Sequence, residues 1–191
     1  MGLFSKMKEN GDNEKNEHNK PSGGQSFPEK MAFSFEDIPS NLEEMLKMPE
    51  ISMDSPYKTA ALAICALCAY SQDKESGLAM LDYLRGPRPL SNAEKSFLKD
   101  RFMDNGKYIP FSYFSGANPQ NDYMPQPPYT LDFFSDRYSF SQPGYAKLSI
   151  RSGGADSSRQ ITMRSKDGKW YLWDQAVMVG IRAPKSSDPW L

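Results

Sequence analysis

The chain of 191 residues contains one histidine, His18, and it lies in a polar stretch near the N-terminus. Imidazole is the usual base of serine and cysteine nucleophiles, and it is a usual ligand of catalytic zinc and iron. The sequence beyond residue 30 therefore lacks the side chain on which these enzymes most often depend. We expect no catalytic residue of these classes, no metal site and no bound cofactor.

The two cysteines, Cys65 and Cys68, have the C-x-x-C spacing of redox pairs. In redox proteins such a pair begins a helix, where the helix dipole lowers the thiol pKa. Here both lie inside the apolar stretch YKTAALAICALCAY at residues 57–70. Buried thiols in such surroundings behave as small hydrophobic side chains, so we expect both to be unreactive core residues.

Acidic side chains are plentiful, because the chain contains 24 Asp and Glu residues. A pair of carboxylates could cleave a glycosidic bond or bind a divalent cation. No spacing marks any two of them as partners, and solvent exposure is their ordinary state. An enzyme that uses carboxylates or tyrosines in a cleft between helices and sheet is therefore kept as the alternative interpretation.

Arginines and aromatic residues gather in the C-terminal part of the chain, on segments that alternate between apolar and polar residues. Such side chains are enriched at protein interfaces, and they can also stack on single-stranded nucleic acid. The ordinary alternative is a sheet exterior with cross-strand pairs. A second aromatic group lies in the long loop at residues 108–128, which either lines a ligand pocket or covers the core. Five residues are therefore candidates for binding a ligand or partner: Tyr113, Arg151, Arg164, Tyr171 and Trp173.

The charge balance narrows the possible partners. With 23 basic and 24 acidic residues, the chain has no basic excess for double-stranded nucleic acid and no polybasic cluster for anionic lipid. The N-terminus lacks the apolar core of a secretion signal, and the longest apolar stretch, 59–70, is too short to span a bilayer. We expect a cytoplasmic protein without a transmembrane segment.

The elements that must position the candidate residues form one domain. Residues 1–30 are rich in Asn, Glu, Lys, Gly and Ser, which predicts a disordered tail that is dispensable for folding. Residues 31–191 are predicted to form a single α+β domain. Capping signals and apolar spacing predict helices near 41–48, 57–70, 74–84 and 91–105.

Period-two alternation predicts strands in the second half of the chain. An Asp-Gly pair at 167–168 marks a tight hairpin between the third and fourth strands. The predicted fold is α+β, with an N-terminal cluster of about four helices packed on a C-terminal antiparallel β-meander of four to five strands. The strands are expected near 129–133, 146–151, 161–164 and 170–173, with a short fifth at 176–181.

Several segments resemble an uncharacterised family of Gram-positive anaerobic bacteria. The specific motifs are LRGPRPLS at residues 84–91 and the DPW near the C-terminus, and the resemblance covers roughly residues 33–191. It implies a self-contained bacterial domain of unknown function, with no catalytic residues to carry over. The sequence thus favours a non-enzymatic module that binds an unknown protein or small molecule.

Overall fold

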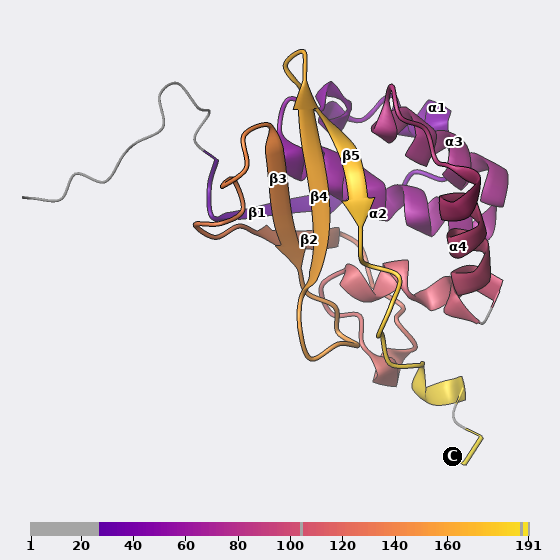
Figure 1. The fold of residues 1–191 in the computed structure, drawn as a ribbon. Helices are drawn as coiled ribbons and strands as arrows, with labels where there is room; N and C mark the ends of the chain where they lie inside the picture. The colour runs from indigo at the N-terminus through magenta and orange to yellow at the C-terminus, as the bar shows by residue number, and fades with distance from the viewer. Residues whose placement is uncertain (1–26, 104, 188, 191) are drawn as a thin grey trace, which may run out of the picture.

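The computed structural model describes residues 27–103, 105–187 and 189–190. Within this part, a central helix packs on one face of a five-stranded antiparallel sheet, and further helices lie beyond one edge of the sheet (Figure 1). The strands lie in sequence order: β1 (Lys30–Phe35), β2 (Tyr129–Phe134), β3 (Tyr145–Ile150), β4 (Arg159–Lys166) and β5 (Lys169–Gln175). The α-helices are α1 (Leu42–Met45), α2 (Pro56–Gln72), α3 (Lys74–Arg85) and α4 (Asn92–Met103). The predicted α+β class, with helices in the N-terminal half and an antiparallel meander at the C-terminus, is confirmed.

Helix α2 forms the centre of the hydrophobic core. Ser55 caps its N-terminus by accepting a hydrogen bond from the backbone of Tyr57, and Pro56 occupies the first turn. The helix is apolar on nearly every side, so it is buried against α3 and the inner faces of β3, β4 and β5. Cys65 and Cys68 are both buried and unpaired, and burial raises the pKa of both thiols. The prediction that they are core residues is confirmed.

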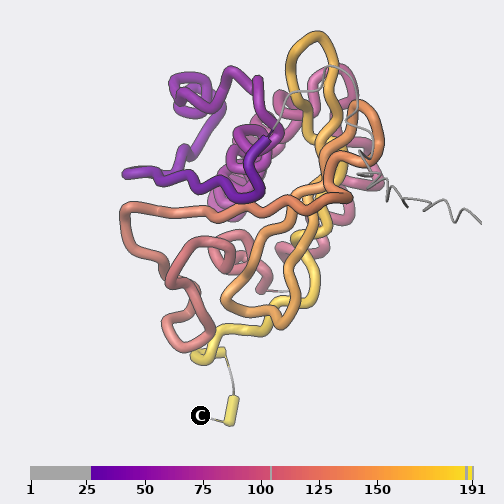
Figure 2. Tube along the Cα trace, turned by 90° about the vertical axis from the view of Figure 1, so that its left-hand side faces the viewer, coloured from indigo at the N-terminus to yellow at the C-terminus, as the bar shows by residue number. Residues whose placement is uncertain are grey.

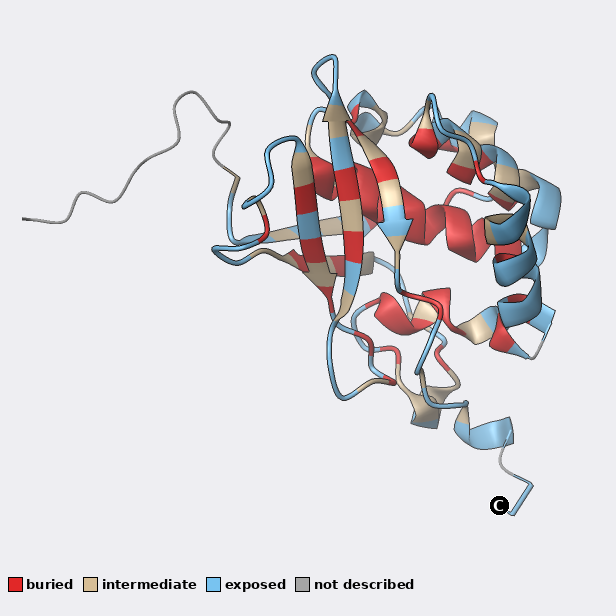
Figure 3. Ribbon diagram, in the orientation of Figure 1, coloured by how far each residue is buried: buried red, intermediate tan, exposed pale blue. Residues whose placement is uncertain are grey.

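The sheet presents one apolar and one polar face. On β3, the buried residues Ala146, Leu148 and Ile150 alternate with more exposed ones, as the period of a half-buried strand requires (Figure 3). The hairpin between β4 and β5 has Asp167 and Gly168 at its tip, with φ angles of 51° and 76°. Positive φ at both positions is the type I′ geometry that Asp-Gly favours, so the predicted hairpin is confirmed.

The identity of the fifth strand corrects the sequence prediction. Residues 176–181 were expected to form it, but they adopt no regular structure, and the fifth strand is β1. This strand pairs along its whole length with β2, which is distant in sequence (Figure 2). The side chains of Ser34 and Thr130 share a hydrogen bond across 96 residues of sequence. The sequence of β1, KMAFSF, does alternate. The strand was not predicted because it directly follows the polar N-terminal segment, with which its first residue was grouped.

Residues 176–182 instead form an irregular segment that the long aromatic loop holds in place. Tyr113 is buried, and its hydroxyl donates a hydrogen bond to the carbonyl of Val177 at 2.6 Å. Tyr108 and Tyr123 stack on each other and donate to the carbonyls of Ile181 and Arg182. The loop therefore covers the core and satisfies backbone carbonyls that a strand would have paired.

Of the predicted tail at residues 1–30, residues 1–26 lie outside the described part of the chain. The four residues that follow contact the domain. Phe27 stacks on Phe140 and packs edge-on against Trp170, and the carbonyl of Pro28 accepts a hydrogen bond from Tyr57. The structure therefore gives residues 27–30 a role in packing.

We predict that removing residues 1–26 leaves the free energy of unfolding unchanged, whereas removing residues 1–30 lowers it by about 2 kcal/mol, because Phe27 is lost from its aromatic contacts. Chemical denaturation of the three chains measures both effects. Phe27→Ala in the full chain is the matched control and should reproduce most of the loss. Equal stabilities for all three chains would show that the packing of Phe27 contributes nothing.

We also predict that dithiobis(nitrobenzoate) modifies neither cysteine of the native protein and both in denaturant. Burial raises the pKa of each thiol, so the reactive thiolate is absent at neutral pH. The core residues packed around α2 also keep the reagent away from both thiols. The absorbance of the thiolate released from the reagent, measured with and without denaturant, gives the number of cysteines that react. Rapid modification of one thiol in the folded state would contradict its assignment to the core.

Candidate functional site

The outer face of strands β3, β4 and β5 is the open side of the sheet, because α2 covers the opposite face (Figure 1). Cross-strand register brings three side chains of this face together at one end of the sheet. Tyr145 on β3 pairs with Arg164 on β4, and Arg164 pairs with Tyr171 on β5. Two residues beyond Tyr171, on the same face, lies Trp173.

Trp173 is flanked by two arginines. The guanidinium of Arg88 lies 4.5 Å from the centre of the Trp173 ring, and that of Arg164 lies 4.7 Å from it. Arg164 also lies 5.2 Å from the ring centre of Tyr145, which packs edge-on against Trp173. Each of these contacts is a cation–π interaction between a guanidinium and the negative face of a ring. We call this group of four residues the arginine–tryptophan ladder.

The turn between α3 and α4 places Arg88 in the ladder. Helix α3 ends at Gly86, whose φ of 58° is a conformation that side chains disfavour, and a Cβ at this position would collide with the ring of Tyr171. Arg88 donates a hydrogen bond to the backbone carbonyl of Trp173 at 3.1 Å, and Arg85 donates to the same carbonyl at 3.3 Å. The turn is thereby fastened to the free edge of β5.

Arg85 is the buried support of this turn. Its side chain is 2% exposed, and it forms an ion pair of 2.7 Å with Glu94 at the start of α4. Burial lowers the pKa of Arg85, while the charge of Glu94 opposes that shift. Burial alone would raise the pKa of Glu94, but hydrogen bonds from Ser91 and the charges of the arginines outweigh it and lower the pKa. Ser91 and Glu94 form a capping box at the start of α4.

Two hollows flank the ladder, and Arg88 and Trp173 line both of them. The first has a volume of about 390 Å³ and the second about 450 Å³. Basic residues outnumber acidic ones in their walls: the basic residues are Arg85, Arg88, Lys147, Arg164 and Lys166, and the acidic ones are Glu94 and Asp174. The site is therefore positive on a chain whose formal net charge is −1.

The donor groups of Arg164 are available. Its guanidinium stacks on two rings, but it donates no hydrogen bond to any residue in the described part of the chain. Arg88 differs, because it also reaches Glu94 at 3.5 Å and the Trp173 carbonyl. The face of the Arg164 guanidinium is thus held by aromatic contacts, while the N–H donors of its planar edge are not used by any described residue.

The structure brings three of the five predicted binding residues together: Arg164, Tyr171 and Trp173. Arg151 lies on the same face at the other end of the sheet, 5.2 Å from the ring centre of Phe134. Tyr113 is 3% exposed, and burial raises its pKa. It lines, together with Arg151, a hollow of about 370 Å³ away from the ladder.

Sequence reasoning missed Arg88 and Tyr145, although both left a signal. Arg88 belongs to the LRGPRPLS motif, and Tyr145 continues the alternation of Lys147 and Ser149 by one step.

The enzyme alternative requires tyrosine hydroxyls or carboxylates that are free to react. Tyr108, Tyr113 and Tyr123 use their hydroxyls to hold backbone carbonyls. Glu94 and Asp174 line one hollow, but both oxygens of Glu94 are already engaged by Arg85 and Ser91. Among residues 27–103, 105–187 and 189–190, no group of three or more His, Cys, Asp or Glu side chains is placed to hold a metal ion.

None of the helices in the described part of the chain combines the length and apolar character needed to cross a bilayer.

We predict that Glu94→Gln lowers the free energy of unfolding by about 2 kcal/mol at neutral pH, because it leaves the buried Arg85 without its carboxylate. The folded-state pKa of Glu94 is lowered, so its contribution is present above the unfolded pKa of about 4.3 and is lost as pH falls through the folded value. The difference in the free energy of unfolding between wild type and variant should therefore shrink below about pH 4.

Urea denaturation at several pH values measures this difference. Glu43→Gln is the matched control, because Glu43 forms an exposed ion pair with Lys47 and its loss should change stability little. A difference that is absent at neutral pH, or that widens in acid, would show that the Arg85–Glu94 pair does not support the turn.

Comparisons with known proteins place the chain in a family. A family model described as a domain of unknown function, DUF6935, matches residues 37–185. Neither the curated proteins nor the solved structures contain a match to the chain. The matched region includes the α3–α4 turn and all of β2 to β5, and therefore every residue of the ladder. This chain belongs to the DUF6935 family.

Proposed function

We propose that this domain is a non-enzymatic binding module that holds an anionic group of its ligand or partner at the arginine–tryptophan ladder. The observation that carries the proposal is the state of Arg164: its guanidinium is fixed between Tyr145 and Trp173, yet none of the described residues accepts a hydrogen bond from it. A fixed fork of N–H donors matches the geometry of a carboxylate or phosphate.

Fixing the arginine before the ligand arrives favours binding. A free arginine side chain loses considerable rotamer entropy when it becomes ordered on a ligand. Contacts with Trp173 and Tyr145 already order Arg164, so less of that entropy is lost on binding. The arrangement therefore supports recognition of an anion by a group that is in place beforehand.

The electrostatic surroundings support the same conclusion. Five basic and two acidic residues line the two hollows; Arg85 and Glu94 neutralise each other, which leaves four basic residues and one acidic residue, Asp174. Lys147 and Lys166 form no ion pair with a described residue, so their charges add to the local positive potential. A basic site on a chain with little net charge attracts an anion locally without favouring nucleic acid in general.

The enzyme alternative has less support. Acid–base chemistry by paired carboxylates needs two of them with free oxygens, and of the two that line the first hollow Glu94 is engaged on both oxygens, which leaves Asp174 without a free partner there. A cytoplasmic location in a Gram-positive anaerobe, and an unknown protein or small molecule as the partner, remain predictions from the sequence.

We predict that the protein binds inorganic phosphate and glutarate, and that Arg164→Gln weakens both by about tenfold or more, because a hydrogen bond to a charged group is worth about 1.5–3 kcal/mol. Isothermal titration calorimetry at low ionic strength measures the affinities, since salt screens exposed charges.

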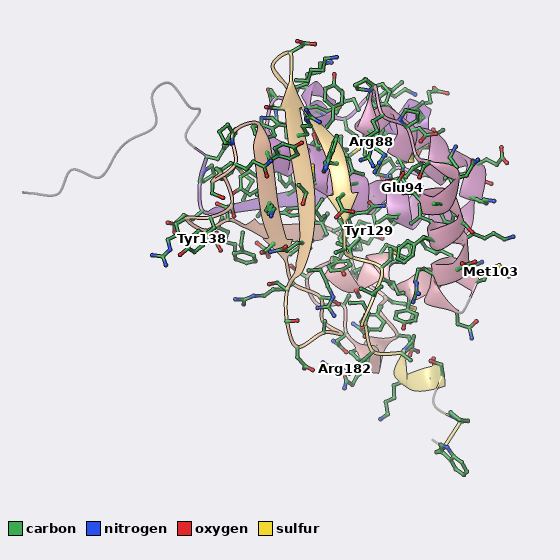
Figure 4. The ribbon with its side chains drawn as sticks, in the orientation of Figure 1. Arg88, Glu94, Met103, Tyr129, Tyr138 and Arg182 are labelled. Atoms are coloured by element: carbon green, nitrogen blue, oxygen red, sulfur yellow. The ribbon has the colours of Figure 1, made fainter. Side chains whose placement is uncertain are left out.

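The matched control is Arg137→Gln. Arg137 also stacks on an exposed aromatic residue, Tyr138, at 4.6 Å, so the substitution removes the same charge and the same kind of contact at a distance from the ladder (Figure 4). The control should bind both anions as the wild type does. Equal losses in the two variants, or no binding by the wild type, would refute the proposed function.

A further inference from the structure

We infer that the partner is an extended acidic polypeptide segment that lies along β3 and places one carboxylate at the ladder and another at Arg151. This inference rests on the proposed function and extends it along the whole outer face of the sheet. Its basis is a second group of cations and an aromatic ring, built like the first and located at the opposite end of the same face.

The second group surrounds Phe134 on β2. Arg151 lies 5.2 Å from the centre of the Phe134 ring, and Lys30 on β1 lies 5.5 Å from it. Lys30 is paired with Asp132 at 3.0 Å, whereas Arg151 has neither an ion pair nor a hydrogen bond within the described residues. Arg151 therefore shares the decisive feature of Arg164, a stacked guanidinium whose donors are open. A hollow of about 370 Å³ lies beside it.

Strand β3 connects the two groups. Its residues on this face begin with Tyr145 in the ladder and continue through Lys147 and Ser149, and Arg151 follows the end of the strand. Six residues of extended chain span about 20 Å. Lys147 is exposed between the two arginines and forms no ion pair with a described residue, so the positive charge continues along the strand. An extended peptide whose acidic residues are six positions apart has the matching length.

The rings on this face favour an acidic peptide over single-stranded nucleic acid. Base recognition by stacking needs an open aromatic face. Trp173 has guanidinium groups at 4.5 and 4.7 Å from its centre, and Phe134 carries Lys30 and Arg151 in the same way. Cations thus lie against Trp173 and Phe134, and at these two rings the face offers a partner N–H donors. Those donors recognise carboxylates in an extended chain and provide no platform for bases.

The test uses two capped nine-residue peptides of identical composition, with two glutamates and otherwise Ser, Thr and Gln. In the first peptide the glutamates stand at positions 2 and 8, and in the second they are adjacent at positions 5 and 6. We expect the first to bind the full-length protein about tenfold more tightly, because only it reaches both arginines. Arg164→Gln and Arg151→Gln should each remove most of that advantage in calorimetry at low ionic strength, with thermal melts confirming that both variants are folded.

Two further probes separate this inference from the proposed function. Arg137→Gln is again the control and should bind the first peptide as the wild type does. Octauridine tests nucleic acid, and tighter binding of octauridine than of the peptide would overturn the inference. Equal affinity for the two peptides, or no effect of Arg151→Gln, would overturn it as well. In each of these cases, phosphate binding that depends on Arg164 leaves the proposed function intact.

Discussion

The candidate site depends on the contacts of one buried group, the guanidinium of Arg85. It joins three elements: it belongs to the last turn of α3, pairs with Glu94 at the start of α4, and donates to the carbonyl of Trp173 on β5. A charge buried to this degree is stable only where its donors are satisfied. The α3–α4 turn is therefore fixed to the edge of the sheet, and Arg88 reaches Trp173 as a consequence.

Much of the fold could be predicted from local signals. The N-cap at Ser55, the capping box at Ser91 and the Asp-Gly hairpin are short-range patterns whose physical meaning does not depend on the rest of the chain. Helix α1 is likewise capped by a local contact, in which the side chain of Asn41 accepts a hydrogen bond from the backbone of Glu44. Strand β1 could not be predicted in this way, since it becomes a strand only by pairing with a partner distant in sequence.

Two of the four ladder residues, Arg164 and Trp173, could be predicted, again because their positions follow from a short-range pattern. Period-two alternation placed Arg164, Tyr171 and Trp173 on one face, because strand geometry fixes which residues share a side. It could not reveal Arg88, which arrives from a turn between two helices, nor that Tyr113 would serve the C-terminal segment. The LRGPRPLS motif, first noted as a mark of resemblance, forms the helical wall of the site: Arg85, Gly86 and Arg88 each contact β5.

The pairing of β1 with β2 also governs the order in which the chain can assemble. As the protein emerges from the ribosome, residues 30–35 appear first, but their partner at 129–134 follows only after all four helices have been made. Long-range pairing of this kind slows folding, because a large loop must close before the contact is gained. Phe33 and Phe35 must therefore stay without their sheet partners until residues 129–134 have been made, and the nascent helices are the first apolar surface against which they can pack.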